Sequence, residues 1–126
     1  MVIDLGSNDY GSGHIPTTEL WVKAYTDFVQ NISRTYNPPP EIFLTVSHCT
    51  GKNESIKYCA DTQEAVKSMK DKGLNNVHFL DVTVNGTAAW NVPPGTVGCD
   101  AHPSQTAHAL MGQIATPKVK AVMRWD

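Results

Sequence analysis

The chain has 126 residues, 40% of them hydrophobic, and a formal net charge of −2 at pH 7. A chain of this length buries one modest hydrophobic core, so we expect a single domain. The slightly negative charge offers no basic surface for nucleic acid. No apolar run approaches the roughly 18 residues that a membrane-spanning helix needs, so we also expect no membrane partner.

The N-terminal third predicts a strand, a loop and a helix. Residues 2–5 form a short apolar run, and residues 6–16 are rich in Gly, Ser, Asn and Asp, which indicates a loop. From about residue 18 to residue 36, apolar side chains recur at the spacing of a helix with one buried face. Thr17 or Thr18 can cap the first turn of this helix.

The middle of the chain repeats the alternation of strand and helix. Residues 42–46 are a continuous β-prone run, as expected of a strand that is covered on both faces. Residues 61–72 predict a helix, and Gly73 is placed to form its C-terminal cap. Residues 77–84 predict the third strand.

The C-terminal third predicts a long loop and a last helix. Residues 85–98 form the loop, which contains a turn at Pro93-Pro94-Gly95. The helix extends from about residue 104 to residue 114, and we expect Pro117 to kink or restart it. Strands that alternate with helices imply parallel strands joined by helical crossovers, which is the α/β class.

The cysteines favour an oxidising compartment. Cys49 and Cys59 flank a polar loop, residues 50–58, of a length that a disulfide can close. Cys99 is left over, either as a free thiol or with a partner outside this chain. Three free cysteines are the alternative.

Three Asn-x-Ser/Thr sequons, at Asn31, Asn53 and Asn85, suit a secreted eukaryotic glycoprotein. We expect no signal peptide, since Met1 opens directly onto the first predicted strand. We expect neither a metal nor another cofactor, because the histidines are scattered without zinc-ligand spacing. They are His14, His48, His78, His102 and His108.

The first candidate site segment is Leu5-Gly6-Ser7-Asn8-Asp9, directly after the first predicted strand. Ligands of α/β sheets bind beyond the carboxyl ends of the strands, where Asn8 would lie. Its side-chain amide could stabilise the oxyanion of a reacting ester, a contribution on the order of 3 kcal/mol. Gly6 would let the turn tighten, and Asp9 would hold the loop by hydrogen bonds. An ordinary turn is the alternative.

The second candidate segment is Gly98-Cys99-Asp100-Ala101-His102-Pro103, just before the last helix. His102 could act as the general base, because imidazole titrates near neutral pH. Asp100 could accept the other ring N–H and fix the tautomer. Pro103 would start the helix and hold His102 at its N-terminal end.

Together these two segments resemble the Gly-x-Asn-Asp block and the closing Asp/His block of the SGNH (GDSL-type) hydrolases. The spacing Asp100-x-His102-Pro103 is most similar to that of the family 2 carbohydrate esterases, such as acetyl xylan esterases. The resemblance implies a flavodoxin-like, three-layer α/β/α fold with a short parallel sheet. Residues 1–126 would be the C-terminal part of the catalytic domain, acting as an esterase on acetylated carbohydrate.

In the resembled family, the nucleophilic serine lies in a Gly-Asp-Ser block on the first strand, upstream of the Gly-x-Asn-Asp segment. This chain has no such block, so we expect the N-terminal strands and the serine to be missing and the isolated chain to be weak or inactive. The exposed sheet edge predicts a homo-oligomer or pairing with a separate N-terminal half. A non-catalytic carbohydrate-binding or regulatory remnant is the alternative, and an unrelated flavodoxin-like binding domain is a third possibility.

The remaining candidates divide between substrate contact and structure. Tyr10 and Trp90 lie on predicted loops near the same rim, where an aromatic ring could stack on a sugar or simply anchor the loop. Ser47 and Ser104 lack the glycine-flanked elbow of a nucleophile, so we expect them to end a strand and cap a helix. We expect His108 to be structural.

Overall fold

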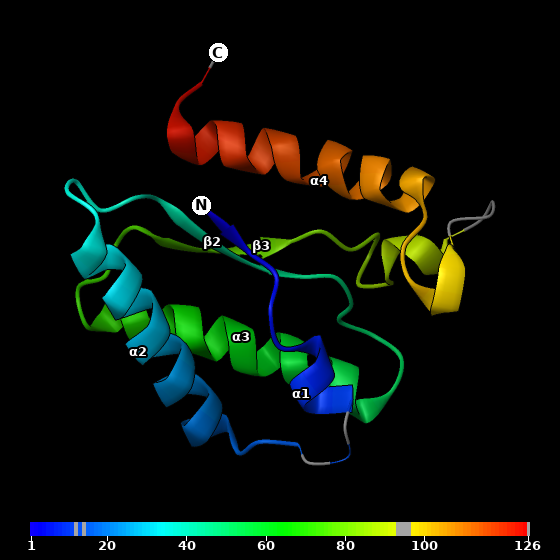
Figure 1. Ribbon diagram of the computed structural model, residues 1–126, viewed down its shortest axis with the longest axis horizontal. Helices are drawn as coiled ribbons and strands as arrows, with labels where there is room; N and C mark the ends of the chain where they lie inside the picture. Colours follow the sequence, from blue (N-terminus) through cyan, green and yellow to red (C-terminus); the bar gives the residue numbers. More distant parts are fainter. Residues whose placement is uncertain (12, 14, 93–96, 126) are drawn as a thin grey trace.

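The structure, a computed structural model, describes residues 1–11, 13, 15–92 and 97–125. At its centre is a parallel three-stranded sheet, with the strands in the order β1 (Val2–Ile3), β2 (Ile42–Val46) and β3 (Val77–Asp81). The helices α2 (Thr18–Thr35) and α3 (Asn53–Asp71) cover one face, and α4 (Gln105–Met123) covers the other (Figure 1). The expected three-layer α/β/α fold with a short parallel sheet is confirmed.

Each face of the sheet has its own hydrophobic cluster. On the side of α2 and α3, Leu44 packs with Tyr58 and Met69, all of them fully buried. On the side of α4, Phe43 and Leu80 pack against apolar side chains of that helix. Neighbouring side chains of a strand point to opposite faces, so Phe43 and Leu44 contribute to different clusters. All five residues of β2 are buried, as its continuous apolar run predicts.

The segment predicted as a loop after the first strand contains a short helix, α1 (Ser7–Gly11), and this part of the prediction is wrong. The backbone turns at Gly6, which has φ +117°. The amide N–H of Asp9 donates to the Gly6 carbonyl at 3.0 Å. Tyr10 then enters the core, where it is 2% exposed. Burial of one aromatic ring therefore overrides the turn-forming composition of the segment.

The helix α3 begins at Asn53, whereas the sequence predicted a start at residue 61. Tyr58 and Thr62 lie one helical turn apart and are both buried, so the apolar face of the helix begins within the supposed loop. Polar neighbours hide this periodicity in the sequence. At the other end, Gly73 follows the last turn with φ +88°, which confirms its predicted role at the helix C-terminus.

The last helix, α4, continues through Pro117, so the predicted end near residue 114 and the restart are wrong, and a kink at Pro117 stays a prediction. A proline inside a helix removes one backbone donor. Packing of Val119, Val122 and Met123 against the sheet supports the part of the helix beyond it. At its start, the Ser104 hydroxyl accepts from the Ala107 N–H at 3.2 Å, as expected of a helix cap.

The long segment after β3 holds two short 3-10 helices, η1 (Ala89–Asn91) and η2 (Cys99–Ala101). The third strand ends at Asp81, three residues earlier than the predicted bound of residue 84. The predicted turn at Pro93-Pro94-Gly95 lies outside the described residues. None of the helices in the described part of the chain is both long and apolar enough to cross a membrane.

A disulfide joins Cys49, which follows β2, to Cys59 in α3, and this predicted pair is confirmed. Cys99 is a free, exposed thiol. The bridge ties the segment after β2 to α3 and limits how far the two can move apart.

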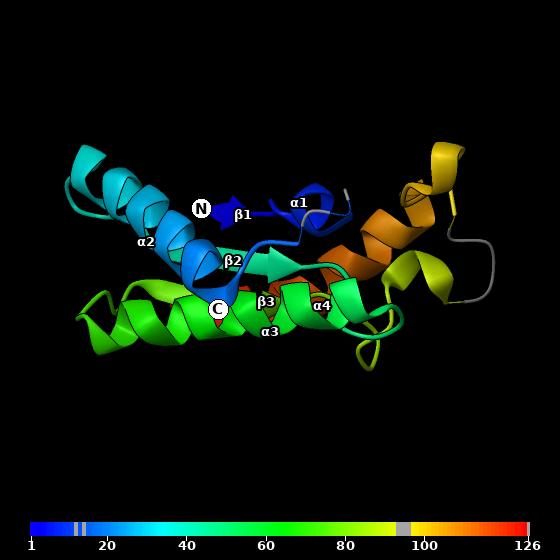
Figure 2. The same ribbon diagram turned by 90° about the horizontal axis from the view of Figure 1, so that it is seen from below.

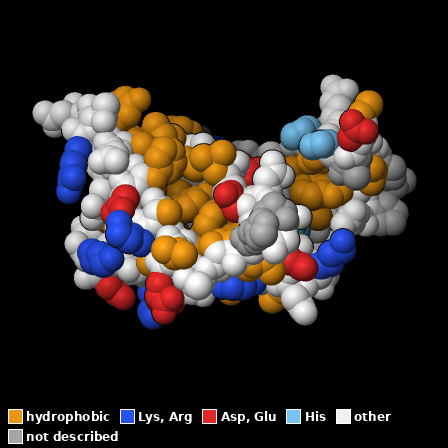
Figure 3. All heavy atoms as spheres, turned by 60° about the horizontal axis from the view of Figure 1, so that its bottom comes forward, with side chains coloured by type: hydrophobic (Ala, Val, Ile, Leu, Met, Phe, Trp, Pro, Cys, Tyr) orange, Lys and Arg blue, Asp and Glu red, His pale blue; other side chains and the backbone are white. Residues whose placement is uncertain are grey.

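The strand β1 forms one edge of the sheet, beside α1 (Figure 2). Val2 is 57% exposed and Leu5 is 55% exposed. Figure 3 shows hydrophobic side chains gathered over this edge and the neighbouring part of α2. An apolar strand edge of this kind can pair with another chain, which keeps the expectation of association open.

Candidate functional site

The carboxyl ends of the strands lie at one end of the molecule, and several connecting segments gather there (Figures 1 and 2). The helix α1 follows β1, the segment beginning at Ser47 follows β2, and η1 follows β3. The 3-10 helix η2 lies at this same end. In α/β sheets, this end is where ligands bind.

Two tyrosine hydroxyls and a close packing contact fix the turn before α1. The carbonyl of Leu5 accepts a hydrogen bond from Tyr25 at 2.6 Å and another from Tyr58 at 3.0 Å. A Cβ atom built on Gly6 would lie 2.1 Å from the Trp21 ring. Only glycine fits this position, because the backbone passes against an indole with a positive φ.

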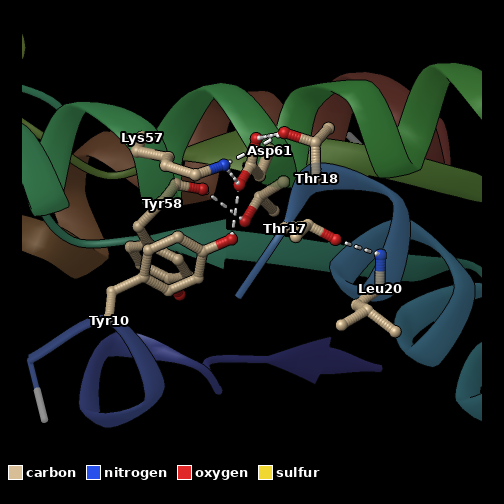
Figure 4. Close-up of polar contacts among 8 residues, drawn as sticks. Tyr10, Thr17, Thr18, Leu20, Lys57, Tyr58 and Asp61 are labelled. Carbon is tan, nitrogen blue, oxygen red and sulfur yellow. Dashed lines mark hydrogen bonds and ion pairs between the residues drawn. The ribbon is translucent and has the colours of Figure 1, made fainter. Parts of the chain in front are cut away.

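A buried carboxylate holds the far side of α1 (Figure 4). Asp61 of α3 accepts from the hydroxyls of Tyr10 at 2.7 Å and Thr18 at 2.8 Å, and from the Lys57 ammonium at 2.5 Å. Burial acts to raise the pKa of Asp61, but these three donors outweigh it and hold the pKa below its ordinary value. The network therefore joins α1, α2 and α3 around one ionised group.

Tyr10 was predicted on a loop, but it lies in the short helix α1. Its ring is buried at 5.0 Å from the Trp21 ring, and its hydroxyl is bonded to Asp61, so Tyr10 anchors α1. Tyr10 also lines a cavity of about 200 Å³ at the strand ends, and its contact with substrate stays a prediction.

Two adjoining cavities at the strand ends share His48, Lys52 and Ser55, and we call them together the strand-end groove. The smaller cavity, about 200 Å³, extends from these residues toward Ser7 of α1. The larger, about 390 Å³, extends toward Trp90 of η1. The larger volume falls within the range of small-molecule sites, roughly 300 to 1,000 Å³.

His48 lines both cavities of the strand-end groove, and no motif in the sequence marks it as a site residue. Its Nδ1 atom lies 3.1 Å from the hydroxyl of Ser47, and its ring lies 6.0 Å from the ring of Trp90. Burial lowers the pKa of His48, an effect that the nearby carboxylate of Asp4 opposes. Its position directly after a buried strand was the available signal, since the same rule selected Asn8.

The predicted catalytic residues lie at this end of the molecule, and no side-chain hydrogen bond joins them among the described residues. Asn8 is exposed on α1, and His102 is exposed where η2 leads into α4. Asp100 adopts a left-handed conformation with φ 51°, and its side chain makes no hydrogen bond to His102 among the described residues. None of the three lines either cavity of the strand-end groove. Their joint role stays a prediction.

The backbone around His102 is nevertheless well defined. The Gly98 N–H donates to the His102 carbonyl at 2.7 Å, and the His102 N–H donates to the Cys99 carbonyl at 3.0 Å. Val97 and Pro103 form an isolated antiparallel bridge. This compact turn presents the His102 side chain to solvent at the N-terminal end of α4. Asp9 is likewise exposed, and it lies beside Asn8 on α1.

Comparison with known proteins gives a consistent result. No family model matches the chain. It is 27% identical over 124 residues to an acetylxylan esterase / glucomannan deacetylase of Cellvibrio japonicus, covering 96% of this chain and 30% of that protein. It is also similar to a family two carbohydrate esterase of Clostridium thermocellum solved in complex with cellohexaose. That match has 26% identity and a TM-score of 0.80, and covers 99% of this chain and 36% of the other.

A third match is a carbohydrate esterase family 2 enzyme of Corynascus thermopiles (Myceliophthora fergusii), with 25% identity and a TM-score of 0.73. It covers 98% of this chain and 37% of the other. These three matched proteins are carbohydrate esterases by name. The curated relative and the solved structures all point to the family 2 carbohydrate esterases, and this chain spans about a third of their length.

Proposed function

We propose that this chain forms part of the site of a carbohydrate esterase that removes acetyl groups from a polysaccharide. The observation that carries the proposal is that α1, η2 and the strand-end groove all lie at the carboxyl end of the sheet, in a fold shared with family 2 carbohydrate esterases. The acetylxylan esterase / glucomannan deacetylase of Cellvibrio japonicus supports the choice of acetyl esters.

In the proposed reaction, a serine hydroxyl attacks the carbonyl carbon of the acetyl group while His102 takes the hydroxyl proton. The side-chain amide of Asn8 and the backbone at Gly6 stabilise the resulting oxyanion. Collapse of this intermediate expels the sugar oxygen, which receives the proton from His102. Water then attacks the acetyl-serine by the same route and releases acetate. Asp100 orients His102, and Asp9 holds the loop that carries Asn8.

The nucleophile is the part of the proposal that these residues do not supply. Ser47 is 6% exposed at the end of β2, and the Ser104 hydroxyl is engaged as the cap of α4. Neither is open to the ester of a large substrate. This chain spans about a third of the length of its relatives. We therefore propose that the serine lies in a segment that corresponds to the remaining two thirds.

The proposal includes the cell compartment and the substrate contact. The three sequon asparagines, Asn31, Asn53 and Asn85, are exposed, as glycosylation requires. With the Cys49–Cys59 bridge, they favour a secreted glycoprotein. The half-buried ring of Trp90 lines the larger cavity and would pack against the apolar face of a sugar.

A second candidate function is carbohydrate binding without catalysis. Two observations favour it: Trp90 offers an aromatic ring in the wall of the larger cavity, and one similar esterase was solved with cellohexaose. Isothermal titration of the chain with cellohexaose tests this candidate. Measurable binding, together with ester hydrolysis that does not depend on His102, would favour it over catalysis.

The test of the proposed reaction uses p-nitrophenyl acetate, which imidazole attacks slowly even without a serine. We expect weak hydrolysis that falls on His102→Ala substitution and is unchanged by His108→Ala, a matched change at an exposed position of α4. Equal effects of the two substitutions would contradict a special role for His102. Labelling of Ser47 by a serine-directed fluorophosphonate would show that the nucleophile lies within this chain.

A further inference from the structure

The rings of His48 and Trp90 form a corner in the larger cavity of the strand-end groove. Their planes meet at 72° with the centroids 6.0 Å apart, and both residues line the cavity. The corner joins the segments that follow two neighbouring strands, since His48 comes after β2 and Trp90 after β3. It therefore offers an aromatic surface and a polar ring edge to the same ligand.

The contact with Ser47 determines which nitrogen of His48 carries a hydrogen. Ser47 is buried, and its hydroxyl has no other hydrogen-bond partner among the described residues. If the hydroxyl donates to Nδ1, both its hydrogen and the ring lone pair are satisfied. If Nδ1–H donated instead, a buried hydroxyl hydrogen would be left unpaired, which costs more than an unused oxygen lone pair. Ser47 is therefore the donor, and the proton of neutral His48 resides on Nε2.

His48 lines both cavities of the groove, and its Nε2 atom is not one of the buried polar atoms. Among the described residues, none forms a hydrogen bond with it, and it is absent from the buried polar atoms that lack a partner. A neutral imidazole with Nε2–H presents one fixed donor toward a ligand. Such a donor can form a hydrogen bond to a hydroxyl oxygen or to the ring oxygen of a sugar. The adjacent indole of Trp90 can pack against the C–H face of the same sugar.

We propose that the corner formed by His48 and Trp90 is a binding subsite for one pyranose ring. In this subsite, Trp90 packs against the face of the ring, and His48 donates from Nε2–H to a sugar oxygen. Ser47 is a positioning residue that holds His48 in this tautomer. The inference rests on the proposed action on carbohydrate and deepens it, but it does not require the chain to hydrolyse an ester.

The charged and titratable groups around His48 set the pH range of the subsite. Asp4 follows β1, Tyr58 lies on α3 with its ring 5.7 Å from that of His48, and Lys52 and Glu54 line the adjoining cavity walls. Burial holds the pKa of His48 below its ordinary value despite Asp4. The ring is therefore neutral at pH 7, and the fixed donor is available there.

The first experiment reads the tautomer directly. Long-range 1H–15N correlation spectra of the chain at pH 7, assigned with His48→Gln, should show a protonated Nε2 and an unprotonated Nδ1. In Ser47→Ala, this preference should weaken toward a mixture of tautomers. A protonated Nδ1 in the unmodified chain, or the same spectrum in Ser47→Ala, would overturn the assignment of Ser47 as the positioning residue.

The second experiment measures the affinity for cellohexaose by calorimetry. We expect His48→Phe, which keeps the ring but removes the donor, to weaken binding on the order of 10-fold. His48→Gln, whose amide can still donate, should recover most of that loss, and His108→Gln on α4 should bind like the unmodified chain. A thermal melt of each variant checks that it is folded. Equal affinity of folded His48→Phe and the unmodified chain for cellohexaose would overturn the subsite.

The two proposals fail in different ways. Weaker cellohexaose binding in His48→Phe, together with p-nitrophenyl acetate hydrolysis that His102→Ala leaves unchanged, supports the subsite and contradicts the proposed role of His102 in the esterase. Hydrolysis that depends on His102, with cellohexaose affinity unchanged in His48→Phe, supports the esterase and contradicts the subsite. Absence of cellohexaose binding in the folded, unmodified chain also contradicts the subsite.

Discussion

Replacing Gly6 by alanine should destabilise the protein strongly, because the new methyl group has no room. The added Cβ would lie 2.1 Å and 2.7 Å from two atoms of the Trp21 ring and 3.0 Å from Tyr58. Overfilling of a packed core costs about 1–3 kcal/mol. The φ of +117° adds roughly 1–2 kcal/mol for a residue with a side chain. We expect a total loss of about 3 kcal/mol, or a melting temperature lower by about 12 °C.

Thermal unfolding followed by circular dichroism measures this loss, and Trp21 fluorescence reports the local rearrangement. Gly11→Ala is the matched control, since a Cβ atom there meets nothing within 4 Å. It should change the melting temperature by no more than about 2 °C. If Gly6→Ala melted within that same margin, the close approach of α1 to Trp21 would be wrong.

Three further predictions concern stability and assembly. Tyr10→Phe removes one donor to Asp61 and should lower the free energy of unfolding by about 2 kcal/mol, measured by urea denaturation. Tyr36→Phe, at an exposed position, should leave that free energy unchanged, and equal effects of the two substitutions would refute the hydrogen-bond network around Asp61. Folding lowers the pKa of His48, so the unfolded chain takes up a proton on His48 at a higher pH than the folded chain does. The free energy of unfolding should therefore fall as the pH drops through about 6.5, and His48→Phe should reduce this dependence on pH. Parallel pH profiles for the variant and the unmodified chain would contradict the burial of a neutral ring. Association through the apolar β1 edge should give a mass above the 13.8 kDa of one chain in analytical sedimentation, and Val2→Lys should bring that mass closer to one chain. A monomer at all concentrations would contradict association through that edge.

The layers of the fold could be predicted because each regular element carries its own periodicity. The run at residues 42–46 is apolar throughout and becomes the fully buried β2. The apolar stripe of residues 18–36 becomes α2, with Thr17 capping it through the Leu20 N–H. In both cases, the burial pattern and the local propensity agree, so the sequence alone is sufficient.

The elements that were missed depend on contacts between distant residues. The helix α1 is short and polar, and its one core residue, Tyr10, finds its partners in α2 and α3. Likewise, Pro117 does not end α4, because the sheet surface supports the helix beyond it. No local pattern reports such long-range packing, so tertiary structure overrides propensity at these positions.

The same limit applies to the candidate site. Asn8 and His102 could be selected because each stands in a recognisable segment, and the fold places both segments at one end of the sheet. His48 stands in no such segment, and only the meeting of Ser47, Trp90 and the two cavities gives it a role. The burial of Tyr10 in a short helix could not be predicted, because burial cannot be read from an isolated aromatic residue.

The most direct test of the central claim is acetate release from acetylxylan by a chimera, in which this chain replaces the matching segment of the Cellvibrio japonicus esterase. The account predicts acetate release by the folded chimera, and a loss of at least about 100-fold on His102→Ala. A chimera with a cooperative thermal transition that releases no acetate, or that is indifferent to His102→Ala, would contradict the claim that this chain carries part of an esterase site.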